Sequence, residues 1–187
     1  MLTRRTLFRQ ASALGLSGLL PAAAQASKTG PFTPDWTSLV SGYRTPDWFR
    51  DAKFGIWSHW GPQCVPEFGD WYGRLMYVQG SHTYEHHLKT YGHPGRFGFM
   101  EFNNRWKAER WEPEALIQLY RKAGARYFVA MANHHDNLDM FDSAHHAWNT
   151  LNVGPRRDIV GTWEKIARRE GLRFGVSNHG AHAWHWW

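Results

Sequence analysis

The chain has 187 residues, with 22 lysines and arginines against 16 acidic residues, and a formal net charge of +6. Residues 1–26 hold three of the arginines and no acid, which leaves 19 basic against 16 acidic residues, so the charge gives no ground for nucleic-acid binding. The single cysteine, Cys64, excludes an intrachain disulfide. Twelve tryptophans and twelve histidines are a large excess, and aromatic faces beside imidazoles suit a sugar, which has an apolar face and a rim of hydroxyls.

Residues 1–26 predict an export signal that is removed from the mature protein. Arg4 and Arg5 open a basic segment, residues 11–20 are mildly apolar, and residues 24–26 read Ala-Gln-Ala, a small-residue cleavage site. The paired arginines are typical of the twin-arginine route, with an ordinary secretory signal as the alternative. The apolar run is too short to span a bilayer. We therefore expect an exported protein, periplasmic or secreted, without a membrane anchor.

The first part of the mature chain predicts one strand between irregular segments. Residues 27–46 contain three prolines and are expected to form an irregular lead-in. A short helix over residues 47–50 precedes an apolar strand at residues 53–58, and this strand runs into His59 and Trp60.

The middle of the chain is less regular. A long loop is expected at residues 61–73, because it contains two prolines and three glycines, and a helix is expected from residue 75 to about residue 91. Residues 97–111 are aromatic and basic without clean periodicity. No element is predicted there.

The second half alternates helix and strand. Pro113 suits a first helical turn, and apolar residues at helical spacing continue that helix to Gly124. A strand at residues 127–132 follows directly. Asp158 is a good N-cap for a helix that ends near residue 170, before a strand at residues 172–177. This alternation predicts an α/β fold with a parallel sheet covered by helices.

Histidines follow all three predicted strands. His59 follows the first strand, the segment Asn133–Asn137 (NHHDN) follows the second, and Asn178 and His179 follow the third. Because ligands of parallel α/β folds bind beyond the carboxyl ends of the strands, these segments are expected to form one wall of a pocket. A solvated turn explains any one of them, but three such turns are harder to ascribe to chance.

From about residue 48 onward, the chain resembles the N-terminal part of the α-L-fucosidases of glycoside hydrolase family 29. Five segments carry the resemblance, and they occur in the order of the family. They are KFGIWSHWG (53–61), GDWYGRLMY (69–77), AGARYFVAMANHHDN (123–137), WNTLNVGPRRDIVG (148–161) and GLRFGVSNH (171–179).

The resemblance implies that residues 47–187 form the N-terminal portion of a (β/α)8 TIM-like barrel, with about three of its eight strands. It implies retaining hydrolysis of terminal α-L-fucose, which uses two carboxylates. The family's aspartate nucleophile and its acid/base come from later strands and are expected beyond Trp187, so no catalytic residue is assigned in this chain. We therefore expect a fragment that, by itself, neither folds stably nor hydrolyses fucosides.

What the resemblance supplies is a set of residues for fucose recognition, with a fucosylated oligosaccharide or glycoconjugate as the partner and no metal or cofactor. The implied substrate-binding residues are His59, Asp70, Trp71, His134 and His135, with Trp60 and His179 as further candidates. Some relatives have glutamate at the position of Asp70, and others have an aromatic residue at the exit of the third strand. Here that exit reads Ser177-Asn178-His179, so its contact with the sugar stays unassigned.

Three alternatives remain open at this point. Residues 82–86 match the H-x-x-E-H zinc-protease pattern, although no third ligand is evident. His134, His135 and Asp136 are the ligands expected of a metal-dependent barrel hydrolase. A secreted sugar-binding protein with a catalytically inactive barrel is the non-enzymatic alternative. The sequence predicts neither the fucose linkage nor the oligomeric state.

Overall fold

The computed structural model describes residues 30–181, and the chain divides into two compact units, residues 1–46 and residues 47–187. The described part of the first unit contains one helix, α2 (Trp36–Gly42), where the sequence predicted only irregular chain. Asp35 caps this helix, because its side chain accepts a 2.7 Å hydrogen bond from the amide of Ser38. The expected export signal lies outside the described residues.

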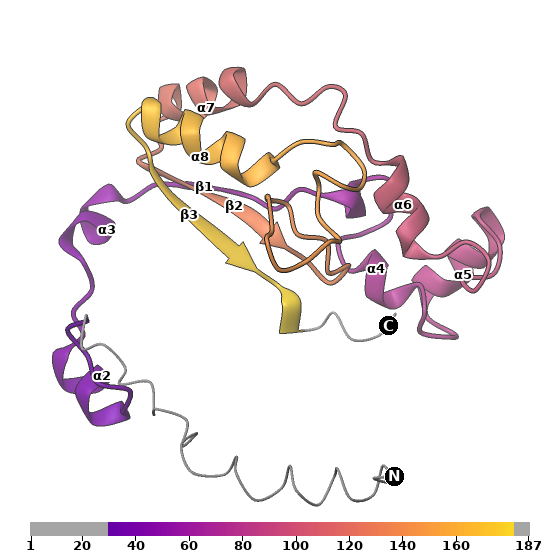
Figure 1. Cartoon of the computed structure of the whole chain (residues 1–187), viewed down its shortest axis with the longest axis horizontal. Helices are drawn as coiled ribbons and strands as arrows, with labels where there is room; N and C mark the ends of the chain where they lie inside the picture. Colours follow the sequence, from indigo (N-terminus) through magenta and orange to yellow (C-terminus); the bar gives the residue numbers. More distant parts are fainter. Residues whose placement is uncertain (1–29, 182–187) are drawn as a thin grey trace, which may run out of the picture. The chain divides into compact units, whose positions relative to one another are not determined.

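The second unit is built on a three-stranded parallel sheet with the order β1-β2-β3 (Figure 1). The strands are β1 (Ile56–Ser58), β2 (Tyr127–Asn133) and β3 (Arg173–Asn178). All three predicted strands are thus confirmed. β1 begins later than predicted because Lys53 adopts a left-handed backbone conformation, with φ of 60°, which interrupts extended chain.

Two long helices cover one face of the sheet. α7 (Pro113–Lys122) and α8 (Ile159–Arg169) lie on the same side of the strands in Figure 1. Both were predicted, with Pro113 in the first turn of α7 and Asp158 as the N-cap of α8. Between residues 30 and 181, none of the helices combines the length and the hydrophobicity that a membrane span requires.

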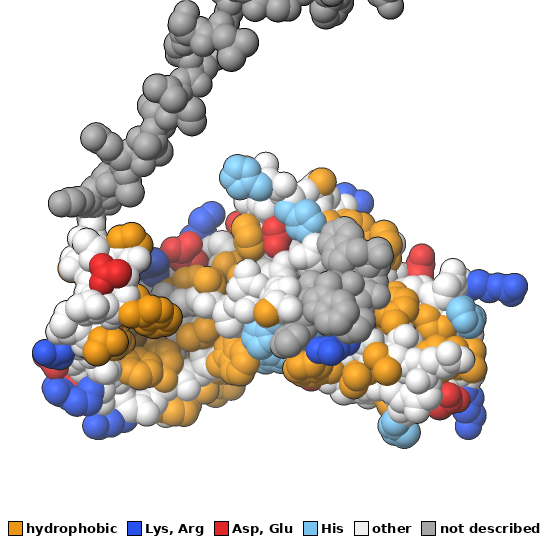
Figure 2. Space-filling model, turned by 90° about the horizontal axis from the view of Figure 1, so that it is seen from below, with side chains coloured by type: hydrophobic (Ala, Val, Ile, Leu, Met, Phe, Trp, Pro, Cys, Tyr) orange, Lys and Arg blue, Asp and Glu red, His pale blue; other side chains and the backbone are white. Residues whose placement is uncertain are grey.

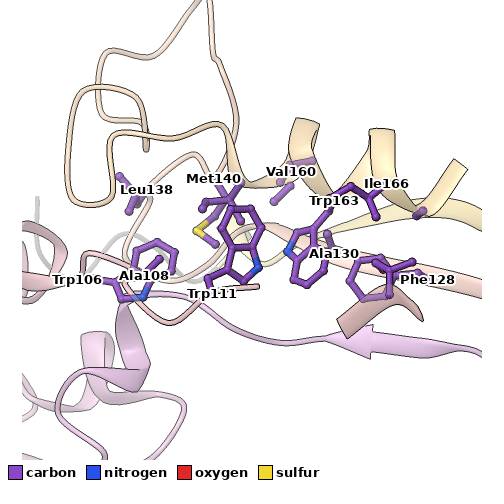
Figure 3. Packing of buried hydrophobic residues seen from close by; sticks show 14 of the residues in the cluster. Trp106, Ala108, Trp111, Phe128, Ala130, Leu138, Met140, Val160, Trp163 and Ile166 are labelled. Carbon is purple, nitrogen blue, oxygen red and sulfur yellow. The ribbon is translucent and has the colours of Figure 1, made fainter. Parts of the chain in front are cut away.

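The main core lies between the sheet and these helices, and it is rich in tryptophan (Figure 3). The Phe128 ring of β2 lies 4.9 Å from the Trp163 ring of α8, and Trp111 contacts the same indole at 5.2 Å. Trp106 is also buried in this cluster. Part of the tryptophan excess therefore serves packing rather than a binding surface, as the rings bury large apolar areas.

On the opposite face of the sheet, the described residues provide only the short helix α3 (Asp47–Ala52), whose Trp48 and Phe49 contact Tyr127 at the start of β2. Trp57, Val129 and Gly175 are register neighbours on that face, and the Trp57 side chain is 51% exposed. Figure 2, seen from below, shows apolar side chains spread over this side of the molecule. Parallel sheets normally have both faces buried, so this face requires a further covering layer.

The connection between β1 and α7 contains four short helices separated by turns. They are η1 (Pro62–Cys64), α4 (Tyr72–Leu75), α5 (His82–Thr90) and α6 (Phe99–Arg105), and α3 (Asp47–Ala52) precedes β1 as predicted. The single helix predicted over residues 75–91 is wrong. Gly80 has φ of 82°, and the Ser81 hydroxyl caps a new helix by accepting from the Tyr84 amide at 3.0 Å.

A second, smaller cluster explains α6, which the sequence pattern missed. Phe99 and Phe102 of α6 pack with Tyr72 and Met76, and all four side chains are buried. An aromatic helix of seven residues is too short to show a clear period, so only its packing reveals it. His87 of α5 closes this cluster, with its Nδ1 atom 2.9 Å from the Tyr72 hydroxyl and its Nε2 atom 2.9 Å from the Phe97 carbonyl oxygen.

We predict that the free energy of unfolding falls as the pH drops below about 6.5, in part because of His87. Burial lowers the pKa of His87, so the unfolded chain takes up this proton at a higher pH than the folded chain. The contribution of His87 to the free energy of unfolding is therefore complete above the pKa that this histidine has in the unfolded chain, and it is lost as the pH falls. Urea unfolding at pH 8 and pH 5 measures it, and a His87→Gln variant should lose less stability between these two values. Equal losses in both proteins would contradict the prediction.

We also predict that Asp158→Ala lowers the free energy of unfolding by about 1 kcal/mol, the usual value of an N-cap. The Asp158 carboxylate accepts a 2.7 Å hydrogen bond from the Gly161 amide at the start of α8. Asp158→Asn retains an acceptor and is the matched control, with a loss of a few tenths of a kcal/mol. Urea unfolding followed by tryptophan fluorescence measures the free energy of unfolding of both variants. Equal losses in Asp158→Ala and Asp158→Asn would show that the charge of Asp158, rather than its capping hydrogen bond, stabilises the helix.

Candidate functional site

The histidines that follow the three strands meet at one edge of the sheet. We call His59, His134 and His179 the histidine cluster. The Nε2 atoms of His59 and His134 lie 3.1 Å apart, and the His179 ring is 4.8 Å from the ring of His59 and 5.2 Å from that of His134. The predicted pocket wall at the carboxyl ends of the strands is therefore present as a geometric feature.

Asp70 joins this cluster from the loop that leads into α4. Its Oδ1 atom lies 2.7 Å from Nε2 of His59 and 3.5 Å from Nε2 of His134. Its side chain is 41% exposed, so the carboxylate faces both the imidazoles and the solvent. One carboxylate oxygen can thus accept from an imidazole while the other accepts from a ligand.

Trp71 and His135 form the adjoining part of the wall. The two rings are 4.4 Å apart, and the His135 ring is 4.1 Å from that of His134. Trp71 is 40% exposed, whereas His135 is buried, so the indole is the more accessible of the pair. The guanidinium of Arg74 lies 5.3 Å above the Trp71 ring, a cation–π distance that orients the indole.

The structure thus brings together all five residues proposed for substrate binding, and it separates one further candidate from them. Trp60 follows His59 but packs into the core, with ring distances of 4.9 Å to Trp106 and 5.8 Å to Trp111. Adjacent residues of an extended chain point to opposite sides. His59 therefore faces the cluster while Trp60 faces the helices, and Trp60 is not placed for contact with the same ligand.

Two neighbours of the cluster were missed by the sequence analysis. The Trp57 indole N–H donates a 2.9 Å hydrogen bond to the Ser177 hydroxyl, across the whole width of the sheet. The Trp57 ring also stacks on His179 at 5.6 Å and meets the edge of His59 at 4.6 Å. Trp57 stands two residues before His59, so the alternation of side chains along a strand was the signal that could have identified it.

The electrostatics of the site keep the buried imidazole of His134 uncharged. Burial, together with the neighbouring His135, His59 and His179, lowers the pKa of His134 to about 3. At neutral pH its ring is therefore a neutral hydrogen-bond donor and acceptor. Burial also raises the pKa of Asp136 to about 7. Asp136 accepts from the Leu138 amide at 3.1 Å, so it acts within the fold rather than toward the cluster.

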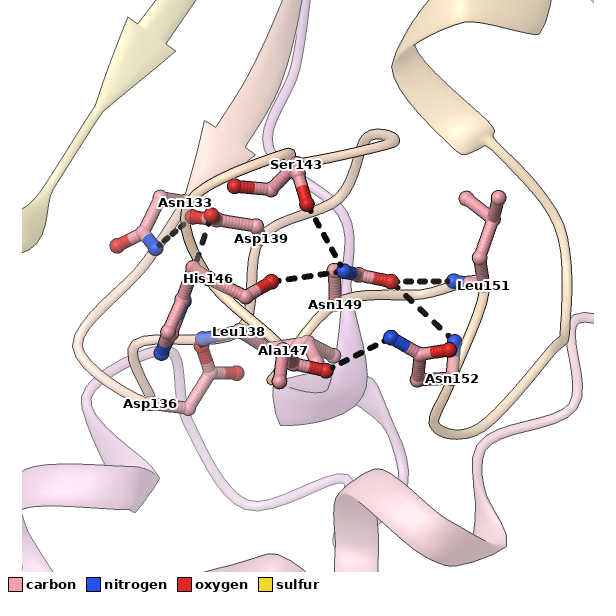
Figure 4. A network of polar contacts seen from close by, with 10 residues as sticks. All are labelled: Asn133, Asp136, Leu138, Asp139, Ser143, His146, Ala147, Asn149, Leu151 and Asn152. Carbon is pink, nitrogen blue, oxygen red and sulfur yellow. Dashed lines mark hydrogen bonds and ion pairs between the residues drawn. The ribbon is translucent and has the colours of Figure 1, made fainter.

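A polar network supports the end of β2 (Figure 4). The Asn133 side chain donates to Asp139 at 2.8 Å, and Asp139 pairs with His146 at 3.3 Å. The carbonyl oxygen of Asn133 accepts from the His179 amide at 2.9 Å, which ties the exit of β3 to that of β2. Asn149 holds the following turn, since its amide donates to the His146 carbonyl oxygen at 2.8 Å. The histidine positions are thus fixed by backbone and side-chain hydrogen bonds.

The protein-family profile described as Alpha-L-fucosidase matches residues 19–186 of this chain. The chain belongs to the α-L-fucosidase family. Tissue alpha-L-fucosidase from Rattus norvegicus is 38% identical over 166 residues, which cover 87% of this chain and 36% of the rat protein. The corresponding protein from Homo sapiens is 33% identical, over 85% of this chain and 34% of its own length. The chain therefore spans about a third of the length of the curated relatives it matches.

Solved structures agree with this assignment. The α-fucosidase of Thermotoga maritima in complex with fucose matches 79% of this chain and 37% of its own, with a TM-score of 0.71 and 36% identity. The same protein with a mechanism-based inhibitor gives the same values. The predicted fold is confirmed: the described residues form a portion of the family's TIM-like domain, with a three-stranded parallel sheet that does not close.

The metal-site alternatives gain no support from the family or from this geometry. The H-x-x-E-H segment lies on α5, where the His86 ring stacks on Phe68 at 3.6 Å and His82 contacts the same ring at 5.0 Å. Asp136 is buried and bonded to Leu138. Among residues 30–181, the histidines whose ring nitrogens converge are instead those of the histidine cluster.

Proposed function

We propose that a protein of family length carrying this chain is a retaining α-L-fucosidase that removes terminal α-L-fucose from glycans or glycoconjugates. The observation that carries the proposal is the convergence of His59, Asp70 and His134 at the carboxyl edge of a parallel sheet, in a chain that belongs to this family. This chain then supplies the wall that recognises the sugar.

Each residue of that wall has a chemical role toward a hydroxyl-rich ligand. The Asp70 carboxylate accepts hydrogen bonds from sugar hydroxyls, and its proximity to two imidazoles fixes its orientation. The neutral His134 ring accepts or donates according to its tautomer. The exposed Trp71 ring offers a flat apolar face or its N–H to the sugar.

We infer that the catalytic carboxylates of the proposed reaction come from the part of the relatives' length that this chain does not match. Retention requires a nucleophile and an acid/base about 5–5.5 Å apart. Asp70 lies 2.7 Å from His59, and Asp136 is buried, so both are assigned to recognition and support. The remaining strands would also cover the open face of the sheet and complete the pocket.

The proposed location of this reaction is outside the cytoplasm, in the periplasm or the surroundings of the cell. Support comes from residues 1–26, with the arginine pair, the weakly apolar run and the small-residue cleavage site. Replacing Arg4 and Arg5 by lysine should abolish export by the twin-arginine route. Export that continues unchanged would favour an ordinary secretory signal.

The decisive test is a hybrid enzyme, in which residues 47–187 replace the matching third of the Thermotoga maritima α-fucosidase. We expect the hybrid to hydrolyse an aryl α-L-fucoside and to discriminate against the aryl α-L-rhamnoside. A folded hybrid without turnover would contradict the proposal. Binding of fucose by that hybrid without turnover would favour the sugar-binding alternative.

A further inference from the structure

Ring nitrogens of three histidines converge at the candidate site, and a carboxylate oxygen of Asp70 lies beside two of them. Nε2 of His59, Nε2 of His134 and Oδ1 of Asp70 form a triangle with sides of 3.1, 2.7 and 3.5 Å. His179 contributes a ring nitrogen that lies within 4.8 Å of those of the other two histidines. Three imidazoles thus approach a common volume, with the Asp70 carboxylate next to two of them.

This spacing is close to that of a tetrahedral metal site. Zinc binds imidazole nitrogen and carboxylate oxygen at about 2.0–2.2 Å, so neighbouring ligand atoms of a tetrahedral site lie about 3.3 Å apart. The 3.1 and 3.5 Å sides of the observed triangle lie within a few tenths of an ångström of that value, and the 2.7 Å side between His59 and Asp70 is shorter. Small rotations of the side chains would equalise them, and His179 would complete the set.

The fold also holds these ligands in place before any ion arrives. Each histidine directly follows a strand of the same sheet, and the His179 amide is bonded to the Asn133 carbonyl oxygen at 2.9 Å. The Trp57 ring contacts both His59 and His179. Because ligands that are already positioned lose little freedom on binding, such a site favours association.

We propose that His59, His134 and His179, together with Asp70, bind a divalent transition-metal ion of the zinc class. Three neutral imidazoles and one carboxylate leave the bound ion with a single positive charge, which suits a reversible site. The ion uses residues of the proposed fucose wall and therefore excludes the sugar. Metal binding does not depend on the proposed sugar specificity, so the metal-binding proposal and the proposed fucosidase function can each be refuted without the other.

The binding is expected to be reversible by chelators rather than structural. Metal-bound imidazoles normally donate their second N–H to an acceptor, and loss of that acceptor weakens binding by about 10- to 100-fold. The buried Nδ1 atom of His59 has no hydrogen-bond partner within residues 30–181. Because His59 lacks this second acceptor, we expect a strong chelator to remove the ion from the site.

The test is a titration of the hybrid enzyme, purified without a polyhistidine tag and freed of metal by a chelator, with cobalt(II) chloride. We expect one equivalent of Co²⁺ to produce the visible absorption of a four-coordinate ion, and one equivalent of Zn²⁺ to abolish it. His59→Ala, His179→Ala and Asp70→Asn should each weaken Co²⁺ binding at least about tenfold, since a lost ligand costs no less than a lost supporting contact. Near-UV circular dichroism checks the fold of each variant.

The matched control is His145→Ala, which removes an exposed histidine outside the cluster and should leave the titration unchanged. His134 is buried, so His134→Ala is not needed for the conclusion. The proposal is overturned if the folded hybrid shows only the spectrum of hydrated Co²⁺. It is equally overturned if the four-coordinate spectrum persists in His59→Ala and His179→Ala, or if His145→Ala removes it.

Discussion

His134→Ala in the hybrid enzyme is expected to lower kcat/KM for an aryl α-L-fucoside by on the order of a hundredfold. The His134 side chain is buried and lies between His59, His135 and His179. Loss of a buried hydrogen-bonding partner costs about 1–3 kcal/mol, and each 1.4 kcal/mol is a factor of ten. The substitution also removes a neighbour of Asp70, which lies 3.5 Å from the imidazole.

His145→Ala is the control for this substitution, because it removes an exposed histidine that lies outside the cluster. His134→Asn retains a polar side chain and separates hydrogen bonding from packing. A melting temperature that falls in His134→Ala while kcat/KM stays near that of the parent would assign the residue to stability alone. Since burial and neighbouring histidines hold the pKa of His134 near 3, its replacement should leave the shape of the pH–rate profile between pH 5 and 8 unchanged.

The 187-residue chain by itself is expected to hydrolyse no aryl α-L-fucoside above background. A retaining mechanism needs two carboxylates, one of them ionised beneath the anomeric carbon. Asp70 contacts two imidazoles, whereas the buried Asp136 has a pKa raised to about 7 and accepts from the Leu138 amide. Neither arrangement supplies the required pair.

The same chain is expected to self-associate. The Trp57 side chain is 51% exposed on the uncovered face, and Val176 of β3 is 56% exposed. Open strand edges and uncovered apolar faces pair with other copies. Light scattering after size exclusion measures the association, and a fucoside assay measures turnover. Turnover that disappears in Asp70→Asn would contradict our assignment, since it would place a catalytic carboxylate in this chain.

Much of the fold could be predicted from local pattern. Pro113 and Asp158 mark the starts of α7 and α8 because first-turn proline and N-cap chemistry depend on a few adjacent residues. The strands were visible as apolar runs between polar segments. The prediction failed for α2, α6 and the break before α5. These helices are short, and their stability depends on capping or aromatic packing rather than on a periodic stripe.

Strand order and residue type are properties of the chain, so three strands that end in histidine and five family-like segments were predictable from the amino-acid sequence. Which of these side chains meet depends on the folded structure. Trp57 and Ser177 are 120 residues apart, and His59 and His134 are 75 residues apart. Their contacts follow from the register of parallel strands, and alternation along β1 turns Trp60 into the core. The distances that define the site depend on packing between distant segments, which no local pattern encodes.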